Sequence, residues 1–152
     1  MTALRTALTH LASLSVAGVS HNYGIDQIPP TLNRAQLPAL LVLPIDVRDV
    51  RLFKERGEGF QTVAFSGGAR TMTYTVTHLL LVSAASATHG LQRQLPALID
   101  LIDAYFTALK ADVTLGGTLL EPAHVTVEPG TFAHGETKYY GCALRHLWKL
   151  EV

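Results

Sequence analysis

Residues 71–83 read TMTYTVTHLLLVS, and this stretch decides the fold class. Threonine occupies every second position up to residue 77, and larger, mainly apolar side chains stand between the threonines. Because successive side chains of a β-strand point to opposite faces, the alternation predicts a strand over 70–83 with one polar and one apolar face. From Leu79 to Val82 every position is apolar, which predicts burial on both faces.

The segments before this strand predict two more strands. Residues 60–66 precede the turn residues Gly67-Gly68, so 60–66 and 70–83 are expected to form an antiparallel hairpin. Residues 37–45 form an apolar run with prolines near both ends, as expected of a buried strand.

Two further strands are expected near the C-terminus. Residues 123–128 alternate weakly and are expected to end at Pro129-Gly130. The segment KYYGCALRHLWKLEV at 138–152 alternates throughout, and it predicts a long strand with Cys142, His146 and Trp148 on one face.

Helical spacing occurs twice. Leucines at steps of three or four predict an amphipathic helix over 2–15, with Thr2 as its N-cap. A second helix is expected over 95–110, and a start as early as Thr88 stays open because Pro96 fits a first turn but kinks a helix interior. The proline-rich segment 20–38 is expected to be an irregular connection.

The predicted order of elements is α-β-β-β-α-β-β, a mostly antiparallel β-sheet with two α-helices packed on it, which is an α+β fold. A chain of 152 residues suits one domain, 1–152. Of its residues, 48% are hydrophobic and 16% charged, which favours a folded chain whose surface is partly covered by other subunits. Twelve basic residues balance twelve acidic ones, so no global field attracts nucleic acid or an anionic membrane.

A third of the charged side chains gathers in the stretch DVRDVRLFKERGEGF at 46–60. Two interpretations stay open: a solvated hairpin loop, or a protruding charged β-hairpin arm that contacts another subunit. Alternating signs of charge suit pairing with a neighbour, and the apolar Leu52 and Phe53 also favour the arm. The stretch is longer than most hairpin loops as well.

Familiar catalytic motifs do not occur in the sequence. GxSxG and P-loop motifs are missing, and the seven histidines lie outside any HExxH-type pair. The single cysteine, Cys142, rules out a disulfide within the chain and a multi-cysteine zinc site. We therefore expect no enzyme, no catalytic residue, no metal and no cofactor.

Nucleic acid and membranes are also unexpected as partners. The aromatic residues lack an interleaved basic patch, which argues against sequence-specific nucleic-acid binding. The N-terminal segment makes a poor signal peptide, and the apolar runs fall far short of the roughly 20 residues that span a bilayer.

The whole pattern resembles the tail-terminator, or tail-completion, proteins of long-tailed phages, the group typified by the lambda terminator. The resemblance covers nearly the full length. It lies in the N-terminal helix TALRTALTHLASL, the loop ending in LPALLVLP, the charged hairpin, the helix near 95–110 and the closing strand YYGCALRHLWKLEV.

This resemblance implies a structural virion protein without catalysis. The family forms a homo-oligomeric ring, usually a hexamer, that caps the tail tube, stops its polymerisation and joins it to the head connector. The implied partners are other copies of the chain, the tail-tube protein and the head-side connector protein, and the ring lumen allows DNA to pass. The implied location is the tail or neck of the virion, after assembly in the host cytoplasm.

A closed ring needs a heterologous interface, and strand edges and polar strand faces are natural places for one. The polar faces at 71–77 and 145–151 are expected to line a lumen or a subunit contact. The expected contact residues are Arg48, Asp49, Arg51, Phe53, Lys54, Glu55 and Arg56 in the arm, with Arg145 and Lys149 in the last strand.

Two alternatives stay open. Other head–tail joining, neck or minor tail proteins share the same general plan. A different class, a small histidine-containing enzyme or ligand-binding protein, would require the fold to gather several imidazoles in a pocket.

Overall fold

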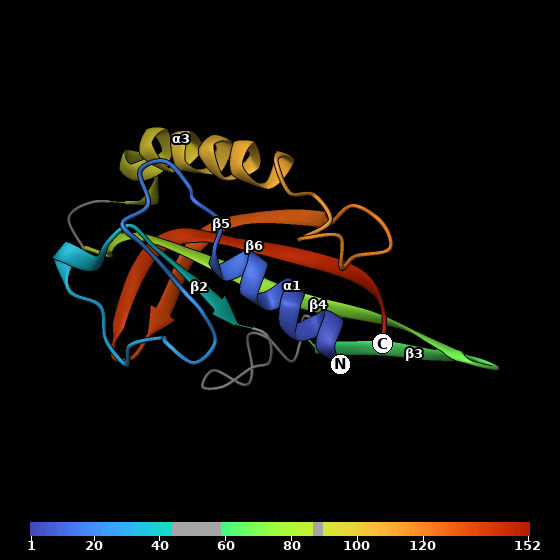
Figure 1. The fold of residues 1–152 in the computed structure, drawn as a ribbon. Helices are drawn as coiled ribbons and strands as arrows, with labels where there is room; N and C mark the ends of the chain where they lie inside the picture. The colour runs from blue at the N-terminus through green and yellow to red at the C-terminus, as the bar shows by residue number, and fades with distance from the viewer. Residues whose placement is uncertain (44–58, 87–89) are drawn as a thin grey trace.

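The structure is a computed structural model that describes residues 1–43, 59–86 and 90–152. In these ranges the chain forms an α+β fold (Figure 1). The helices are α1 (Thr2–Ala12), α3 (Leu91–Lys110) and the short 3-10 helix η1 (Arg34–Gln36). The strands are β1 (His21–Tyr23), β2 (Ala39–Leu43), β3 (Gly59–Ser66), β4 (Ala69–Ala84), β5 (His124–His134) and β6 (Thr137–Glu151).

The strands form one sheet in the order β1-β2-β4-β6-β5, and β3 also pairs with β4. One edge of β4 pairs with β6 along nearly its whole length, from Thr71 opposite Glu151 to Ala84 opposite Tyr139. The other edge of β4 pairs with β3 over its first half and with β2 over its second half. Among the described strands only β1 and β2 run parallel, so the sheet is mostly antiparallel.

The predicted fold class is confirmed, as is the antiparallel hairpin, now β3 and β4. The predicted order is partly wrong, because β1 precedes β2 inside the segment expected to be irregular. Three residues are too few to show a periodicity, and β1 exists because Asn22 and its neighbours pair with the backbone of β2.

Two predicted boundaries differ from the structure, and the start of α3, which the sequence leaves open, is now given. β5 continues through Pro129-Gly130 to His134, and as an edge strand it tolerates a proline that lacks an amide donor. α3 starts at Leu91, so Pro96 lies inside it and removes one helical hydrogen bond. α1 has Met1 as its N-cap, without a side-chain hydrogen bond, and Thr2 is its first residue.

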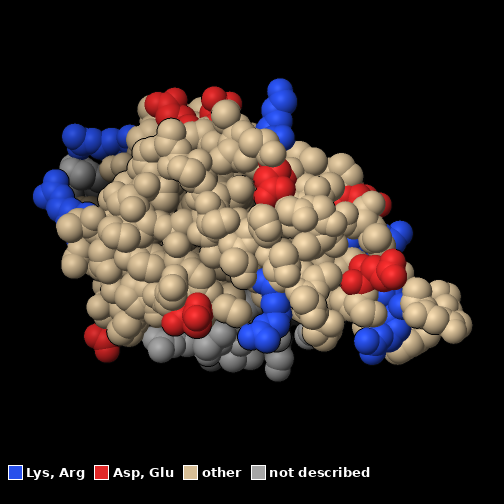
Figure 2. All heavy atoms as spheres, in the orientation of Figure 1, with Lys and Arg blue, Asp and Glu red and all other residues tan. Residues whose placement is uncertain are grey.

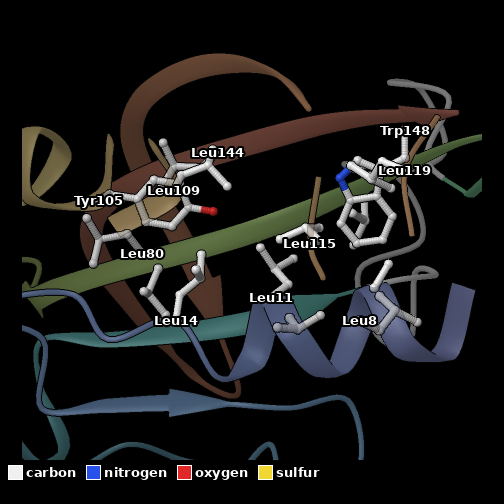
Figure 3. Packing of buried hydrophobic residues seen from close by; sticks show 14 of the residues in the cluster. Leu8, Leu11, Leu14, Leu80, Tyr105, Leu109, Leu115, Leu119, Leu144 and Trp148 are labelled. Atoms are coloured by element: carbon white, nitrogen blue, oxygen red, sulfur yellow. The ribbon is translucent and has the colours of Figure 1, made fainter. Parts of the chain in front are cut away.

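Both helices pack on the same face of the sheet. Figure 3 shows Leu8 and Leu11 of α1 directed toward the sheet, where Leu80, Leu144 and Trp148 lie in the same cluster. Tyr105 and Leu109 bring α3 into this core. The apolar face of β4 that the alternation predicted is therefore the face that the helices cover.

The opposite face is covered at one end by the connection between β1 and β2. Its residues Leu32 and Leu37 pack with Leu79, Leu81 and other side chains in a second, smaller cluster. The tyrosine hydroxyl of Tyr139 donates to the carbonyl of Leu32 at 3.0 Å and fastens this connection to β6. The predicted burial on both faces is thus confirmed for 79–81, with exposures of 2% or less, whereas Val82 is only partly buried.

Candidate assembly surface

The β3–β4 hairpin projects beyond the helices and beyond both labelled chain ends (Figure 1). We call residues 62–69 the hairpin tip; they carry no charged side chain. Phe65 is 76% exposed and Val63 43% exposed, both on the sheet face that the helices cover elsewhere. Figure 2 shows an uncharged projection at the corresponding end of the molecule. An exposed phenylalanine on a projecting hairpin is typical of a contact surface.

The local sequence explains why the chain turns here. Ser66 pairs with Ala69, and Gly67 has a φ of +55°, a conformation that glycine adopts without steric cost. A shift of register between Phe60 and Thr62 marks a β-bulge at the base of the hairpin. Bulges bend the strand that carries them. This one lies near the start of β3, before the part of β3 that extends toward the hairpin tip.

The polar face predicted to line a contact is divided by burial. Thr77 is fully buried and Thr75 nearly so, which removes both from any surface of the subunit. Thr73, nearer the start of β4, is only partly buried. It lies opposite the exposed Lys149 of β6. The accessible part of this polar face therefore lies beside the base of the hairpin.

The two candidates in the last strand differ in exposure. Lys149 is exposed, whereas the Arg145 side chain is 17% exposed and lies 3.8 Å from the carboxylate of Glu128. Lys149 is thus the better placed of the two for a contact. The arm candidates Arg48, Asp49, Arg51, Phe53, Lys54, Glu55 and Arg56 lie outside the described residues.

Three strand edges are open within the described part of the chain, and the short β1, which pairs with β2 alone, is one of them. β5 pairs with β6 alone, and β3 pairs with β4 alone. Such edges present unpaired backbone groups that a strand from another chain can complete.

Two of the seven histidines meet in the core, on neighbouring strands. His78 of β4 and His146 of β6 are both fully buried, and the hydroxyl of Tyr105 lies between them. That hydroxyl oxygen is 2.8 Å from Nδ1 of His78 and 2.6 Å from Nε2 of His146. The chain of hydrogen bonds continues from Nε2 of His78 to Oδ1 of Asn22, at 2.8 Å.

The ends of this buried chain fix the direction of every hydrogen bond. Trp148 can only donate, so its indole N–H donates to Nδ1 of His146, at 3.3 Å. His146 then carries its proton on Nε2 and donates to Tyr105, which donates in turn to His78. His78 donates to Asn22, whose amide donates to the carbonyls of Leu11 and Leu14 near the end of α1.

Burial keeps both imidazoles neutral. It lowers the pKa of His146 from 6.5 to about 3, and burial together with the proximity of His146 holds the pKa of His78 well below its ordinary value. Burial likewise raises the pKa of the Tyr105 hydroxyl well above its ordinary value. All four ring nitrogens are engaged, so we interpret this chain as a structural network that joins both helices to the sheet.

No signal in the sequence pointed to this network. The sequence places His78 and His146 in strands, Tyr105 among the apolar positions of a helix and Asn22 in a connection, and no pattern links the four. The network depends on β1, the strand that the sequence did not predict, because β1 places Asn22 beside His78.

Other polar groups lie nearer the surface. Nδ1 of His10 lies 3.2 Å from Oδ2 of Asp112. Oδ1 of the same carboxylate accepts a hydrogen bond from the backbone N–H of Gly116 at 2.7 Å. This pair joins the end of α1 to the turn after α3. In the described ranges no group of three or more His, Cys, Asp or Glu side chains is arranged to hold a metal ion.

Comparison with known proteins adds no relative: no protein-family model and no curated protein matches the chain. Among the described helices, none combines the length and the apolar character needed to cross a membrane. The candidate assembly surface consists of the hairpin tip, the open edges and the exposed part of the polar strand face.

Proposed function

We propose that the chain is a structural phage virion protein, a tail terminator whose copies form a ring on the end of the tail tube. The ring stops polymerisation of the tube and joins it to the head connector, and the protein acts without catalysis. Its location is then the tail or neck of the virion.

The projecting hairpin is the observation that supports this proposal best. A subunit that works by contact needs an exposed surface that costs little to desolvate, and the uncharged tip with Phe65 is such a surface. The open edges of β3 and β5 lie on opposite sides of the sheet, as a head-to-tail arrangement of copies requires.

The buried network argues for this proposal over the histidine-enzyme alternative. The two imidazoles that come together are fully buried and use both nitrogens in hydrogen bonds within the subunit. A general base must reach the proton that it abstracts, and neither ring can do so in this arrangement.

Tail-tube assembly tests the proposal. Purified protein is added to tail-tube protein during polymerisation, and tube lengths are measured by negative-stain electron microscopy. We expect shorter tubes that carry a ring at one end, and no effect from an unrelated soluble domain of similar size. Binding to the head connector without any effect on tube length would instead indicate a neck or head–tail joining protein.

A further inference from the structure

A pocket lies at the end of β4 opposite the hairpin tip. Its volume is about 510 Å³, and five of its lining residues are apolar or aromatic: Leu32, Leu37, Val82, Ala84 and Tyr139. Arg34, Ser83 and Thr137 complete the lining. The volume lies within the range of roughly 300–1,000 Å³ typical of pockets that enclose a ligand.

One polar group in this lining has no partner. Oγ of Ser83 is buried and has no hydrogen bond among the described residues. Buried hydroxyls without partners are uncommon in native proteins and call for an explanation. This oxygen has almost no accessible surface, so a docking segment could pair with it only after the lining shifts.

We propose that the hairpin tip of one copy docks into this pocket of the next copy, head to tail. The proposal rests on the proposed function in taking the partner to be a second copy of this chain. It goes further by naming the two surfaces that meet.

The placement of the two surfaces supports a contact between copies. β4 has 16 residues, and at about 3.3 Å per residue its ends lie roughly 50 Å apart, so the tip cannot reach the pocket of its own subunit. Each copy thus carries one projecting element and one cavity at opposite ends. This is the arrangement from which heterologous rings or filaments are built.

The chemistry of the two surfaces is also complementary. The tip is free of charge, so its entry into the mainly apolar pocket brings no ion of its own out of solvent. Phe65 and Val63 match the leucines and Tyr139, and the guanidinium of Arg34 in the lining can lie over the ring of Phe65. Gly67 and Gly68 carry no side chain, and the space beside both Cα atoms is open, so the turn is narrow enough to enter first.

Disulfide trapping tests the proposal. Ser66→Cys places a thiol at the tip, and Thr137→Cys places one in the pocket lining. The native Cys142 is buried and burial raises the pKa of its thiol to about 11, so it does not compete for oxidation. The two variant proteins are mixed in equal amounts, oxidised mildly and separated on a non-reducing gel, and the cross-linked peptides are identified by mass spectrometry.

We expect mixed S66C–T137C dimers to exceed both homodimers at least fivefold, and the double variant to form a ladder of oligomers. The matched control is Thr126→Cys, an exposed strand position outside the pocket, which should cross-link to S66C no faster than chance. Adding Phe65→Ser to the S66C protein should reduce the mixed product several-fold. Mixed product at the level of the control, or a predominance of S66C homodimer, would overturn the proposal.

This test is independent of tube capping. Head-to-tail products from a protein that does not cap tubes would support the docking contact and contradict the terminator. Tube capping without mixed cross-links would support the terminator and contradict the docking contact.

Discussion

Tyr105 is the residue on which the buried network depends, because its hydroxyl joins the two imidazole rings. It accepts from His146 and donates to His78, so both rings are satisfied without any charge. Fully connected polar networks of this kind help to specify a single packing of the core, whereas partly connected ones are costly.

Replacing Tyr105 by Phe should lower the free energy of unfolding by about 3 kcal/mol, because it leaves one buried donor and one buried acceptor unpaired. Urea denaturation followed by circular dichroism measures the change. The control is Tyr139→Phe, which removes one buried hydroxyl that makes a single hydrogen bond, to Leu32, and should cost about 1 kcal/mol. Equal losses in the two variants would show that the network has no special role.

Acid should unfold the protein through the same two rings. Their pKa values are lowered in the folded state, so the unfolded chain binds more protons below its ordinary histidine pKa of about 6.5. Stability is therefore complete above pH 6.5 and falls as the pH drops, by up to about 1.4 kcal/mol per pH unit for each histidine.

Urea denaturation between pH 7 and pH 5 measures this slope. Removing one of the two imidazoles, as in His146→Gln, should reduce the slope by about half, even though the variant is less stable at every pH. A slope that His146→Gln leaves unchanged would contradict the assignment of the effect to this pair.

At the scale of elements, β4 and β6 form the centre of the sheet, and their pairing has one tight point. Gly141 of β6 lies opposite Leu81, next to the shift of register at Val82, and a Cβ there would collide with the backbone carbonyl of Leu80. The glycine is therefore required by the close approach of the two strands and not by its φ angle.

Gly141→Ala should destabilise the protein by about 3 kcal/mol, because relief of the clash requires the two longest strands to separate. The control is Gly68→Ala in the hairpin turn, where a Cβ meets nothing within 4 Å and the change should be small. Thermal unfolding of the two variants gives the comparison. A similar melting temperature for both would mean that the strands adjust without cost.

The elements that the sequence predicts best are those with long, regular patterns. The alternation in 71–83 and 138–152 predicts two strands whose buried faces are as expected, since a face in contact with helices must be apolar. For α3 the periodicity indicates an apolar helix but not which apolar positions face the sheet. The structure buries Leu98, Leu101, Tyr105 and Leu109 and leaves Leu95, Ile99 and Phe106 partly exposed.

At the scale of the whole molecule, the candidate surface could be predicted only in part. The charge pattern draws attention to the arm at 46–60, most of which lies outside the described residues, whereas the composition of the hairpin tip predicts only an ordinary turn. The hairpin tip projects because neighbouring strands differ in length: β4 extends past β2 and past the helices. Such differences in length depend on tertiary pairing, which local patterns do not contain.

A separate prediction concerns the charged arm at 46–60. Replacing Arg48, Arg51 and Arg56 together by Ala should leave the fold intact and weaken ring formation or tube capping, because mixed charges favour pairing between neighbours. Circular dichroism checks the fold, and the tube-length assay checks the assembly.

The matched control removes three other positive charges, from the exposed residues Arg5, Lys110 and Lys138, and should have no effect on assembly. Ring formation and capping that are unchanged in the arm variant would count against a role for the arm.

The uniform direction of the buried hydrogen bonds has an electrostatic consequence for α1. From donor to acceptor the chain runs from Trp148 to Asn22, whose amide hydrogens bring a partial positive charge to the carbonyl of Leu11 in the last turn of α1 and to that of Leu14 just beyond it. These hydrogens thus meet the negative end of the helix macrodipole without carrying a net charge. Because no net charge takes part, the attachment of α1 to the sheet through this network should depend little on ionic strength.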